Sequence, residues 1–312
     1  MMLAAHSRLS IPPETWYLLP LVKRFSLDRP LNPDEIEAAV SIITGHYRWP
    51  DHKLSAQEFR DAVSRLAQPY VRDLVEVVYR WHMQAEGKVR WGDKTPPYIE
   101  ILPELARMFP GSRFIHLIRD GRDVAKSFQA TDWVGWWLHE NAQEWIRAVE
   151  CHWRWIRSEL RDRILLVRYE ALVLETEATL REICRFIGEE FEPQMLSWES
   201  QVDVDQMVPP REAKFHQKLK QRIDPEGVSR WKREMRARQI FVAEAFMGPQ
   251  LTRMGYERRY ASPLWLPAFA LTRGFYRTLK PTFELPTRVS AFLRKRFWVR
   301  RGSTGCADSS SK

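Results

Sequence analysis

The sequence predicts an α/β fold in which a parallel sheet is flanked by helices, with a helical insertion after the N-terminal segment. Two apolar runs, within residues 111–120 and 163–172, are continuous in the way that buried parallel strands are. Segments with helical periodicity alternate with these runs, and this alternation is typical of a parallel sheet with helices on both faces. The 312 residues are enough for one large α/β domain or two small ones.

Residues 31–86 are predicted to form the helical insertion. Asn32 is a capping residue at the start of the first helix. Ser55 and Glu58, three residues apart, form a capping box for the second. The third helix continues at the same periodicity and ends near Gly87.

The alternating part of the fold follows this insertion. A helix is expected to end at Gly188, residues 195–230 are polar and irregular, and a further helix follows them. The elements expected before Gly188 are a short strand, a loop and a helix in 88–110, a strand in 111–120, a helix in 121–129, a long helix in 141–162, a strand in 163–172 and a helix in 176–188.

Composition excludes several functional classes. No apolar run approaches the roughly 18 residues of a membrane-spanning helix, and the N-terminus does not read as a secretory signal. Three distant cysteines favour a reducing compartment without a disulfide framework, so a cytoplasmic location is expected. No spacing of Cys and His resembles a metal site.

The basic charge is a feature of the C-terminus. Residues 261–312 hold ten Lys and Arg and two acidic residues, so they carry +8 of the net charge of +9. The nearly neutral remainder argues against a nucleic-acid-binding protein. We therefore expect a main domain in residues 1–260 and a basic, aromatic extension in 261–312. That extension either touches anionic membranes peripherally, binds acidic polymers or covers its own domain, and its last ten residues are expected to be disordered.

The stretch RFIHLIRDGRDVAKSF, residues 113–128, ends a strand in a dense cluster of charge. Ligands of open α/β sheets bind beyond the carboxyl ends of strands, and the next helix offers free N–H groups. Arg119 can hold an oxyanion in a bidentate clasp, and Ser127 can add a hydroxyl donor. Alternatively, the charges of Arg119, Asp120, Arg122 and Asp123 pair with one another in a turn.

This stretch resembles the 3′-phosphate-binding segment of sulfotransferases that use 3′-phosphoadenosine 5′-phosphosulfate (PAPS). Three further segments are similar to that family, in its bacterial and tyrosylprotein branches: GDKTPPYIEILPELARMFPGSRFIHLIRDGR, RYEALVLETEATLREICRFIG and IDPEGVSRWKREM. The resemblance covers about residues 1–257 and implies a P-loop-type fold. It implies that Arg119 and Ser127 bind the 3′-phosphate, that Tyr169 packs near the adenine, and that Arg122 and Asp123 are structural.

The resemblance also implies two catalytic residues. MLAAHSRLSIPPETWYLLP is similar to the segment after the family's first helix, in which a Glu is the general base, and Glu14 stands there. A base is needed because an acceptor hydroxyl loses its proton as it attacks sulfur. Lys94 in GDKTPP matches a Lys that stabilises charge at the transferred group. If the resemblance is set aside, the alternative interpretation is that Glu14 is an acidic residue in a loop or helix cap and that Lys94 is a lysine in a surface loop.

The family also has two features that this sequence lacks. Some members hold the 3′-phosphate with an Arg-Lys-Gly triplet in the late segment, where this sequence offers Lys218, Lys220 or Arg222 without a basis for choosing between them. The family's first, central strand and its Ser-Gly-Thr loop for the 5′-phosphosulfate are not found, and no glycine precedes Gly45. We therefore expect an N-terminally truncated chain with little transferase activity. Its sheet should have a gap or exposed inner edges around the strands that begin near Val89 and Phe114.

The expected function is the transfer of a sulfuryl group from PAPS to an acceptor hydroxyl or amine, without a metal. The acceptor is a sugar, a lipid, a phenol or a peptide tyrosine, and no nucleic-acid partner is expected. Trp133, Trp136 and Trp137 either line an acceptor pocket or cover the core. The alternative function is a non-catalytic remnant of the same fold that binds 3′-phosphoadenosine nucleotides or a partner. A nucleotide kinase is disfavoured because the sequence has no Gly-Lys-Ser/Thr loop.

Overall fold

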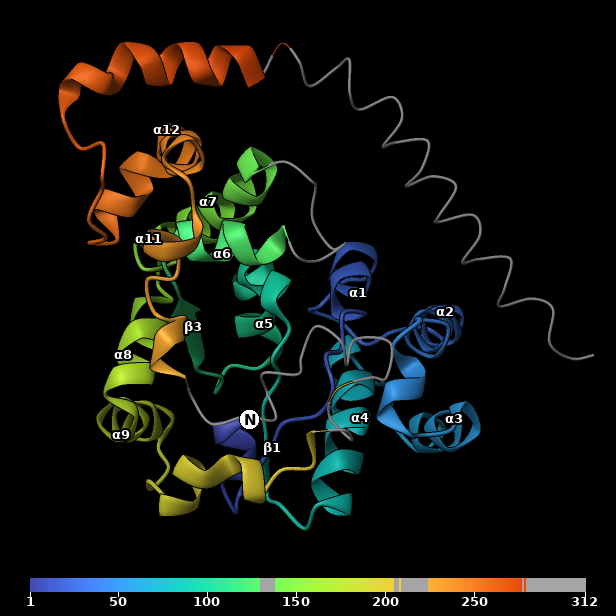
Figure 1. The fold of residues 1–312 in the computed structure, drawn as a ribbon. Helices are drawn as coiled ribbons and strands as arrows, with labels where there is room; N and C mark the ends of the chain where they lie inside the picture. The colour runs from blue at the N-terminus through green and yellow to red at the C-terminus, as the bar shows by residue number, and fades with distance from the viewer. Residues whose placement is uncertain (130–137, 205–207, 209–223, 277, 279–312) are drawn as a thin grey trace, which may run out of the picture. The chain divides into compact units, whose positions relative to one another are not determined.

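The computed structural model describes the chain except for residues 130–137, 205–207, 209–223, 277 and 279–312 (Figure 1). The chain forms two compact units, and each is described by itself. The first comprises Met1–Asp123 and Glu144–Arg233, and the second comprises Val124–Gln143 and the residues from Glu234 onward. The separation into residues 1–260 and 261–312 stays a prediction.

Short parallel strands and many helices confirm the α/β class that was predicted. The helices, with 3₁₀ segments labelled η, are η1 (Met2–Ala5), α1 (Leu18–Arg24), α2 (Pro33–Thr44), η2 (Trp49–His52), α3 (Ala56–Ser64), α4 (Val71–Ala85), η3 (Pro96–Ile101), α5 (Leu102–Met108), α6 (Gly121–Phe128), α7 (Leu138–Trp155), η4 (Arg161–Arg163), α8 (Tyr169–Leu174), α9 (Thr176–Ile187), η5 (Pro193–Ser200), η8 (Pro225–Gly227), α11 (Trp231–Glu234), α12 (Ala237–Arg253) and η9 (Pro263–Trp265).

Helix boundaries follow the capping chemistry of the sequence. The side chain of Asn32 accepts a hydrogen bond from the Glu35 N–H at the start of α2, and the Glu35 carboxylate accepts one from the Asn32 N–H. Ser55 and Glu58 form the same reciprocal pair at the start of α3. At the end of α9, Gly188 takes a left-handed conformation with φ +77°. All three boundaries lie where the sequence predicts them.

The strands form two separate parallel pairs in the first unit. β1 (Leu9–Ser10) pairs with β2 (Arg90–Trp91), and β3 (Phe114–Ile118) pairs with β4 (Ile164–Arg168). Within the described part of the chain, no strand joins the two pairs. The described strands therefore form two sheets of two strands each, and the gap expected near Val89 and Phe114 stays a prediction. β1 itself was not predicted.

Two details differ from the sequence-based expectation. β3 was expected to be buried, but of its five residues only Ile118 is buried, and Leu117 is half exposed. The reason is that a two-stranded sheet leaves part of its surface uncovered. The long helix was expected in residues 141–162, but α7 begins at Leu138 and gives way after Trp155 to turns and η4.

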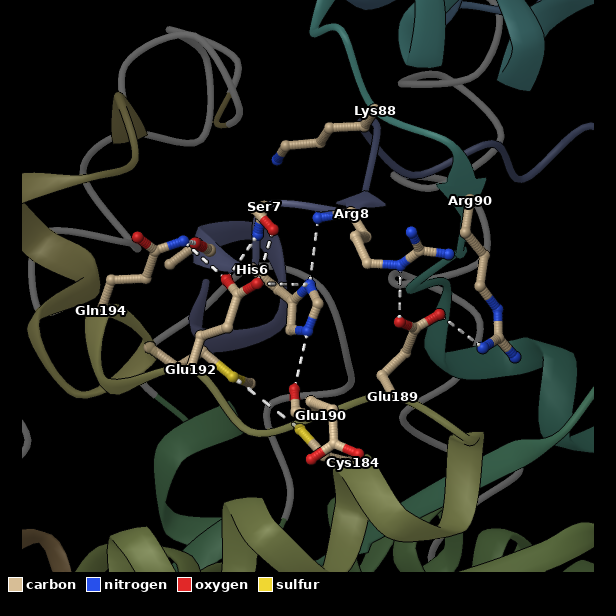
Figure 2. A network of polar contacts seen from close by, with 12 residues as sticks. His6, Ser7, Arg8, Lys88, Arg90, Cys184, Glu189, Glu190, Glu192 and Gln194 are labelled. Carbon is tan, nitrogen blue, oxygen red and sulfur yellow. Dashed lines mark hydrogen bonds and ion pairs between the residues drawn. The ribbon is translucent and has the colours of Figure 1, made fainter.

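A polar network anchors the N-terminal segment to the chain after α9 (Figure 2). His6 Nε2 lies 2.9 Å from the Glu190 carbonyl, and the Ser7 N–H donates to the Glu192 carboxylate at 2.8 Å. Arg8 and Arg90, from the two sides of the β1–β2 pair, both donate to the Glu189 carboxylate, at 2.9 Å and 3.0 Å. These bonds tie the N-terminal segment and β2 to the chain that follows α9, within the first unit.

The apolar core of the first unit has two main parts. The larger part lies among the helices of the insertion and α5, with Tyr17, Phe59, Leu74 and Tyr79 almost completely buried. A smaller part lies under β4 and α9 and contains Val167, Leu180, Ile183, Cys184 and Met195. In the second unit, α12 and the helical residues 266–276 pack through an aromatic cluster around Phe241. No helix in the described ranges is long and apolar enough to cross a membrane.

Candidate functional site

Glu14 and Lys94 come from the carboxyl ends of two paired parallel strands. Glu14 follows β1 by four residues, and Lys94 follows β2 by three. Because Ser10 is opposite Trp91 in the β1–β2 register, the two loops leave the sheet side by side. This edge of a parallel sheet is where ligands of α/β proteins bind.

Three side chains meet at the Glu14 carboxylate. Lys94 Nζ donates to Oε1 in a direct ion pair. Trp16 Nε1 donates to Oε2 at 2.7 Å, and Arg48 Nη2 lies 3.4 Å from the same oxygen. The Arg48 guanidinium also lies over the Trp16 ring, 5.8 Å from its centroid. The carboxylate is therefore oriented by three donors that come from three separate parts of the chain.

The charges around Glu14 keep it ionised. Burial raises the pKa of Glu14, but Lys94 and, to a smaller extent, Trp16 and Arg48 lower it by more, so that the net pKa lies below its usual value. Glu14 is mostly buried, whereas the Lys94 side chain is mostly exposed. At neutral pH the pair presents a carboxylate that can accept a proton beside an ammonium that can offset negative charge.

A buried polar network lies beneath this pair. Thr15 Oγ1 donates to Asp93 Oδ2 at 2.7 Å, and Tyr79 OH donates to the same oxygen at 2.8 Å. Because Thr15 has given its only hydroxyl proton to Asp93, Tyr98 OH must donate to Thr15 Oγ1, at 2.6 Å. Burial raises the pKa of Asp93, although neighbouring hydroxyl donors oppose the shift.

This network fixes the positions of the two reactive side chains. Thr15 directly follows Glu14, and Asp93 directly precedes Lys94. The Thr15 N–H also donates to Thr95 Oγ1 at 3.1 Å, so Thr15 is bonded to the residues on both sides of Lys94. Thr15 and Asp93 were not among the predicted site residues. The sequence could have indicated them, because Thr15 is adjacent to Glu14 in PETW and Asp93 is adjacent to Lys94 in GDKT.

Arg119 and Tyr169 occupy the carboxyl ends of the other strand pair. Arg119 follows β3 and Tyr169 follows β4, and the guanidinium lies over the Tyr169 ring, 4.6 Å from its centroid. Arg119 Nη2 donates to the carbonyl of Gly227 at 2.5 Å. A Cβ at Gly227 would lie only 3.0 Å from Tyr169 OH, so a larger residue here would make the Tyr169 side chain shift slightly. The structure thus brings the late segment onto both predicted residues.

The charged residues after β3 form ion pairs among themselves, as expected if they pair in a turn. Arg122 pairs with Asp120, and Arg119 pairs with Asp123. Arg122 is buried, donates to both carboxylate oxygens of Asp120, and stacks on Trp231 with its guanidinium 3.5 Å from the ring centroid. Asp123 accepts from the Trp231 N–H at 2.7 Å, and its other oxygen lies 3.3 Å from Arg119 Nη2. Arg122 and Asp123 thus make the internal contacts expected of structural residues.

Arg119 has donor capacity left for a ligand. Its Nε is buried and has no hydrogen-bond partner among the described residues, and about a fifth of its side chain is exposed. Burial raises the pKa of the facing Asp123, although the Trp231 N–H and Arg119 lower it. An anion arriving here would replace the Gly227 carbonyl or Asp123 as the partner of the guanidinium.

The placement of the remaining predicted residues relative to this cluster stays a prediction. Ser127 lies in the last turn of α6 and belongs to the second unit. Lys218, Lys220 and Arg222 lie outside the described residues, as do the three tryptophans of TDWVGWW. Across the ranges that the structure describes, no group of three or more His, Cys, Asp or Glu side chains could hold a metal ion.

Comparison with known proteins gives a consistent result. The profile described as "Sulfotransferase family" matches residues 1–193. Protein-tyrosine sulfotransferase 2 of Gallus gallus is 26% identical over 212 residues, covering 65% of this chain and 56% of that protein. Protein-tyrosine sulfotransferase of Drosophila melanogaster is 27% identical over 186 residues, covering 57% and 36%. The chain thus spans about half the length, or less, of these curated relatives.

Two solved structures share the fold. The sulfotransferase domain from the olefin synthase of Synechococcus PCC 7002 aligns with a TM-score of 0.57 at 20% identity, covering 82% of this chain and 88% of that domain. The sulfotransferase domain from the curacin biosynthetic pathway aligns with a TM-score of 0.52 at 18% identity, covering 82% and 92%. At these identities the likeness shows the architecture alone.

Proposed function

Because the chain belongs to the sulfotransferase family, we propose that it transfers a sulfuryl group from PAPS to an acceptor hydroxyl or amine. The observation that carries this proposal is the ion pair of Glu14 and Lys94 at the carboxyl ends of two paired strands. The resemblance predicted both residues to be catalytic, although they lie 80 positions apart in the sequence. In the structure their side chains are in direct contact.

In the proposed step, Glu14 is the general base. An acceptor oxygen attacks sulfur while its proton passes to a Glu14 carboxylate oxygen. A new oxygen–sulfur bond forms, and the bond between sulfur and the bridging oxygen of the donor breaks, leaving 3′-phosphoadenosine 5′-phosphate (PAP). Lys94 offsets the negative charge that develops on the transferred group and the leaving phosphate. No metal ion takes part in this scheme.

Arg119, Ser127 and Tyr169 are proposed to bind the nucleotide end of the donor. Arg119 suits a 3′-phosphate because its buried Nε lacks a partner among the described residues, and Tyr169 offers an aromatic face beside it. Ser127 would add a hydroxyl donor from α6. The test is calorimetric titration with PAP and with AMP, which lacks the 3′-phosphate. PAP should bind at least about tenfold more tightly, and Arg119→Ala should remove that difference. Equal affinities for PAP and AMP would contradict this assignment.

A peptide tyrosine is the proposed acceptor to test first, because the curated relatives are named protein-tyrosine sulfotransferases. We expect ³⁵S from labelled PAPS to appear on a tyrosine peptide. Phenylalanine in place of that tyrosine serves as the matched control. A sugar, a small phenol, a hydroxylated lipid and an amine are the other acceptors to assay.

The same assay separates transfer from binding alone. Tight PAP binding without label on any acceptor would favour the alternative, a non-catalytic nucleotide-binding remnant. Weak turnover by residues 1–312 stays a prediction, and equal turnover by this chain and an N-terminally extended form would contradict it. Label on no acceptor together with no PAP binding would reject both functions.

A further inference from the structure

The helical residues 266–276 pack on α12 through one face only. Phe269 is buried and lies 4.9 Å from Phe241 between ring centroids, and the Arg273 guanidinium donates to the Ala245 carbonyl at 3.2 Å. Tyr276 continues the same stripe and contacts Phe246, with ring centroids 5.9 Å apart. Positions 269, 273 and 276 follow helical spacing, so they define the inner face of this helix.

The opposite face is apolar and exposed to solvent. On this face Leu271 is 75% exposed and Phe275 is 60% exposed, and Leu264 in the turn before the helix and Leu266 at its first residue are 87% and 57% exposed. The exposed residues of this stretch, including the turn before it, are Pro263, Leu264, Trp265, Leu266, Pro267, Ala270, Leu271, Gly274 and Phe275. None of these side chains carries a charge. The solvent-facing side of a surface helix ordinarily carries polar or charged side chains.

This apolar face is unlike the rest of the described surface. Of the ten large hydrophobic side chains that are exposed in the described ranges, five lie between residues 264 and 275. The other five are scattered singly along the chain. Isolated exposed hydrophobic residues are ordinary, but a contiguous patch marks an interaction surface.

The sequence that follows indicates what this surface binds. Residues 277–301 contain eight Lys and Arg against one acidic residue, together with three Phe and one Trp. An apolar face continued by a basic and aromatic stretch fits a lipid surface with anionic headgroups. A protein partner would ordinarily meet polar and charged side chains around the apolar centre, and none of the exposed residues between 263 and 275 is charged.

We propose that the face formed by residues 263–275 docks on membranes that contain anionic phospholipids. One side of this helix packs on α12 while the other is apolar and exposed, so the helix would lie in the interface with its exposed side toward the lipid. Leu264, Leu271 and Phe275 enter the boundary between headgroups and acyl chains. The positive charge that the sequence carries after residue 276 would favour anionic over neutral headgroups.

The test is flotation of the full chain with phosphatidylcholine vesicles that contain or lack phosphatidylserine. The chain should float with the phosphatidylserine vesicles, and high salt should weaken this binding. The variant L271E/F275E should bind at least about tenfold more weakly. The control is Leu174→Glu, because Leu174 lies in the first unit and is 61% exposed. This variant should bind the vesicles as tightly as the unchanged chain does. Circular dichroism melting shows that each variant is folded.

Three results would overturn the proposal. The first is that the unchanged chain stays unbound with both kinds of vesicle. The second is that L271E/F275E floats as well as the unchanged chain. The third is a dimer, measured by light scattering, that L271E/F275E dissociates, since a second copy of the chain would then be the occupant of the face.

Discussion

Glu14 shows how neighbouring charges decide the protonation of one carboxylate. Burial favours the neutral acid, whereas Lys94, Trp16 and Arg48 favour the charged form more strongly. The resemblance to a known family located Glu14 and Lys94 from the sequence. It did not reveal Arg48, because that residue lies 34 positions further along the chain and only the fold brings it to the carboxylate.

Replacing Lys94 with Met should move the acid limb of the pH–rate profile to higher pH. Without the ammonium, burial is opposed only by Trp16 and Arg48, so the pKa of Glu14 rises and the base is protonated at higher pH. The measurement is the transfer rate as a function of pH. Lys23→Met, a change at an exposed lysine of α1, should leave the limb in place. A Lys94→Met profile that falls in height but keeps its acid limb would contradict the proposed coupling.

Helices were easier to predict than strands because their ends have specific chemistry. Two capping boxes and one left-handed glycine located the boundaries of α2, α3 and α9. β1 has only two residues, which is too few for an alternating pattern to appear. The half-exposed Leu117 of β3 could not be foreseen because exposure depends on which other segments cover the sheet.

Gly188→Ala should lower the free energy of unfolding by about 1 kcal/mol. Gly188 has φ +77°, where a Cβ is disfavoured, yet an added Cβ would contact nothing within 4 Å. The cost therefore comes from the backbone alone. The measurement is urea denaturation, with Gly111→Ala as the matched control.

Gly111 isolates the backbone effect because its added Cβ also meets nothing, while its φ lies outside the left-handed region. Gly111→Ala should leave stability unchanged or raise it slightly, since alanine restricts the unfolded chain. If both variants lost the same free energy, the left-handed conformation of Gly188 would not explain its cost.

At the scale of the whole molecule, buried histidines connect stability to pH. His52 Nδ1 and His82 Nε2 lie 3.2 Å apart, so one ring donates a proton and the other accepts it. Burial lowers the pKa of His52 to about 3 and the pKa of His82 to about 4. Both rings are neutral in the folded protein at pH 5, whereas in the unfolded chain they take up protons below a pKa of about 6.5.

Lowering the pH from 7 to 5 should therefore destabilise the fold. The unfolded state gains protons that the folded state does not bind, and each histidine contributes a loss of about 2 kcal/mol over this range. The variant H52Q/H82Q should lose less stability between pH 7 and pH 5 than the unchanged chain, whatever its stability at pH 7. Denaturation at the two pH values measures this difference. Equal losses in both proteins would show that the histidines do not titrate as proposed.

The central claim is that Glu14 takes the acceptor proton during sulfuryl transfer, and single-turnover transfer of ³⁵S from PAPS tests it most directly. Glu14→Gln should slow transfer at least about 100-fold without weakening PAP binding. The control is Glu76→Gln, which removes a carboxylate that is also ion-paired, with Arg80 on α4, and should leave the rate unchanged. Transfer by Glu14→Gln at the rate of the unchanged chain would contradict the claim.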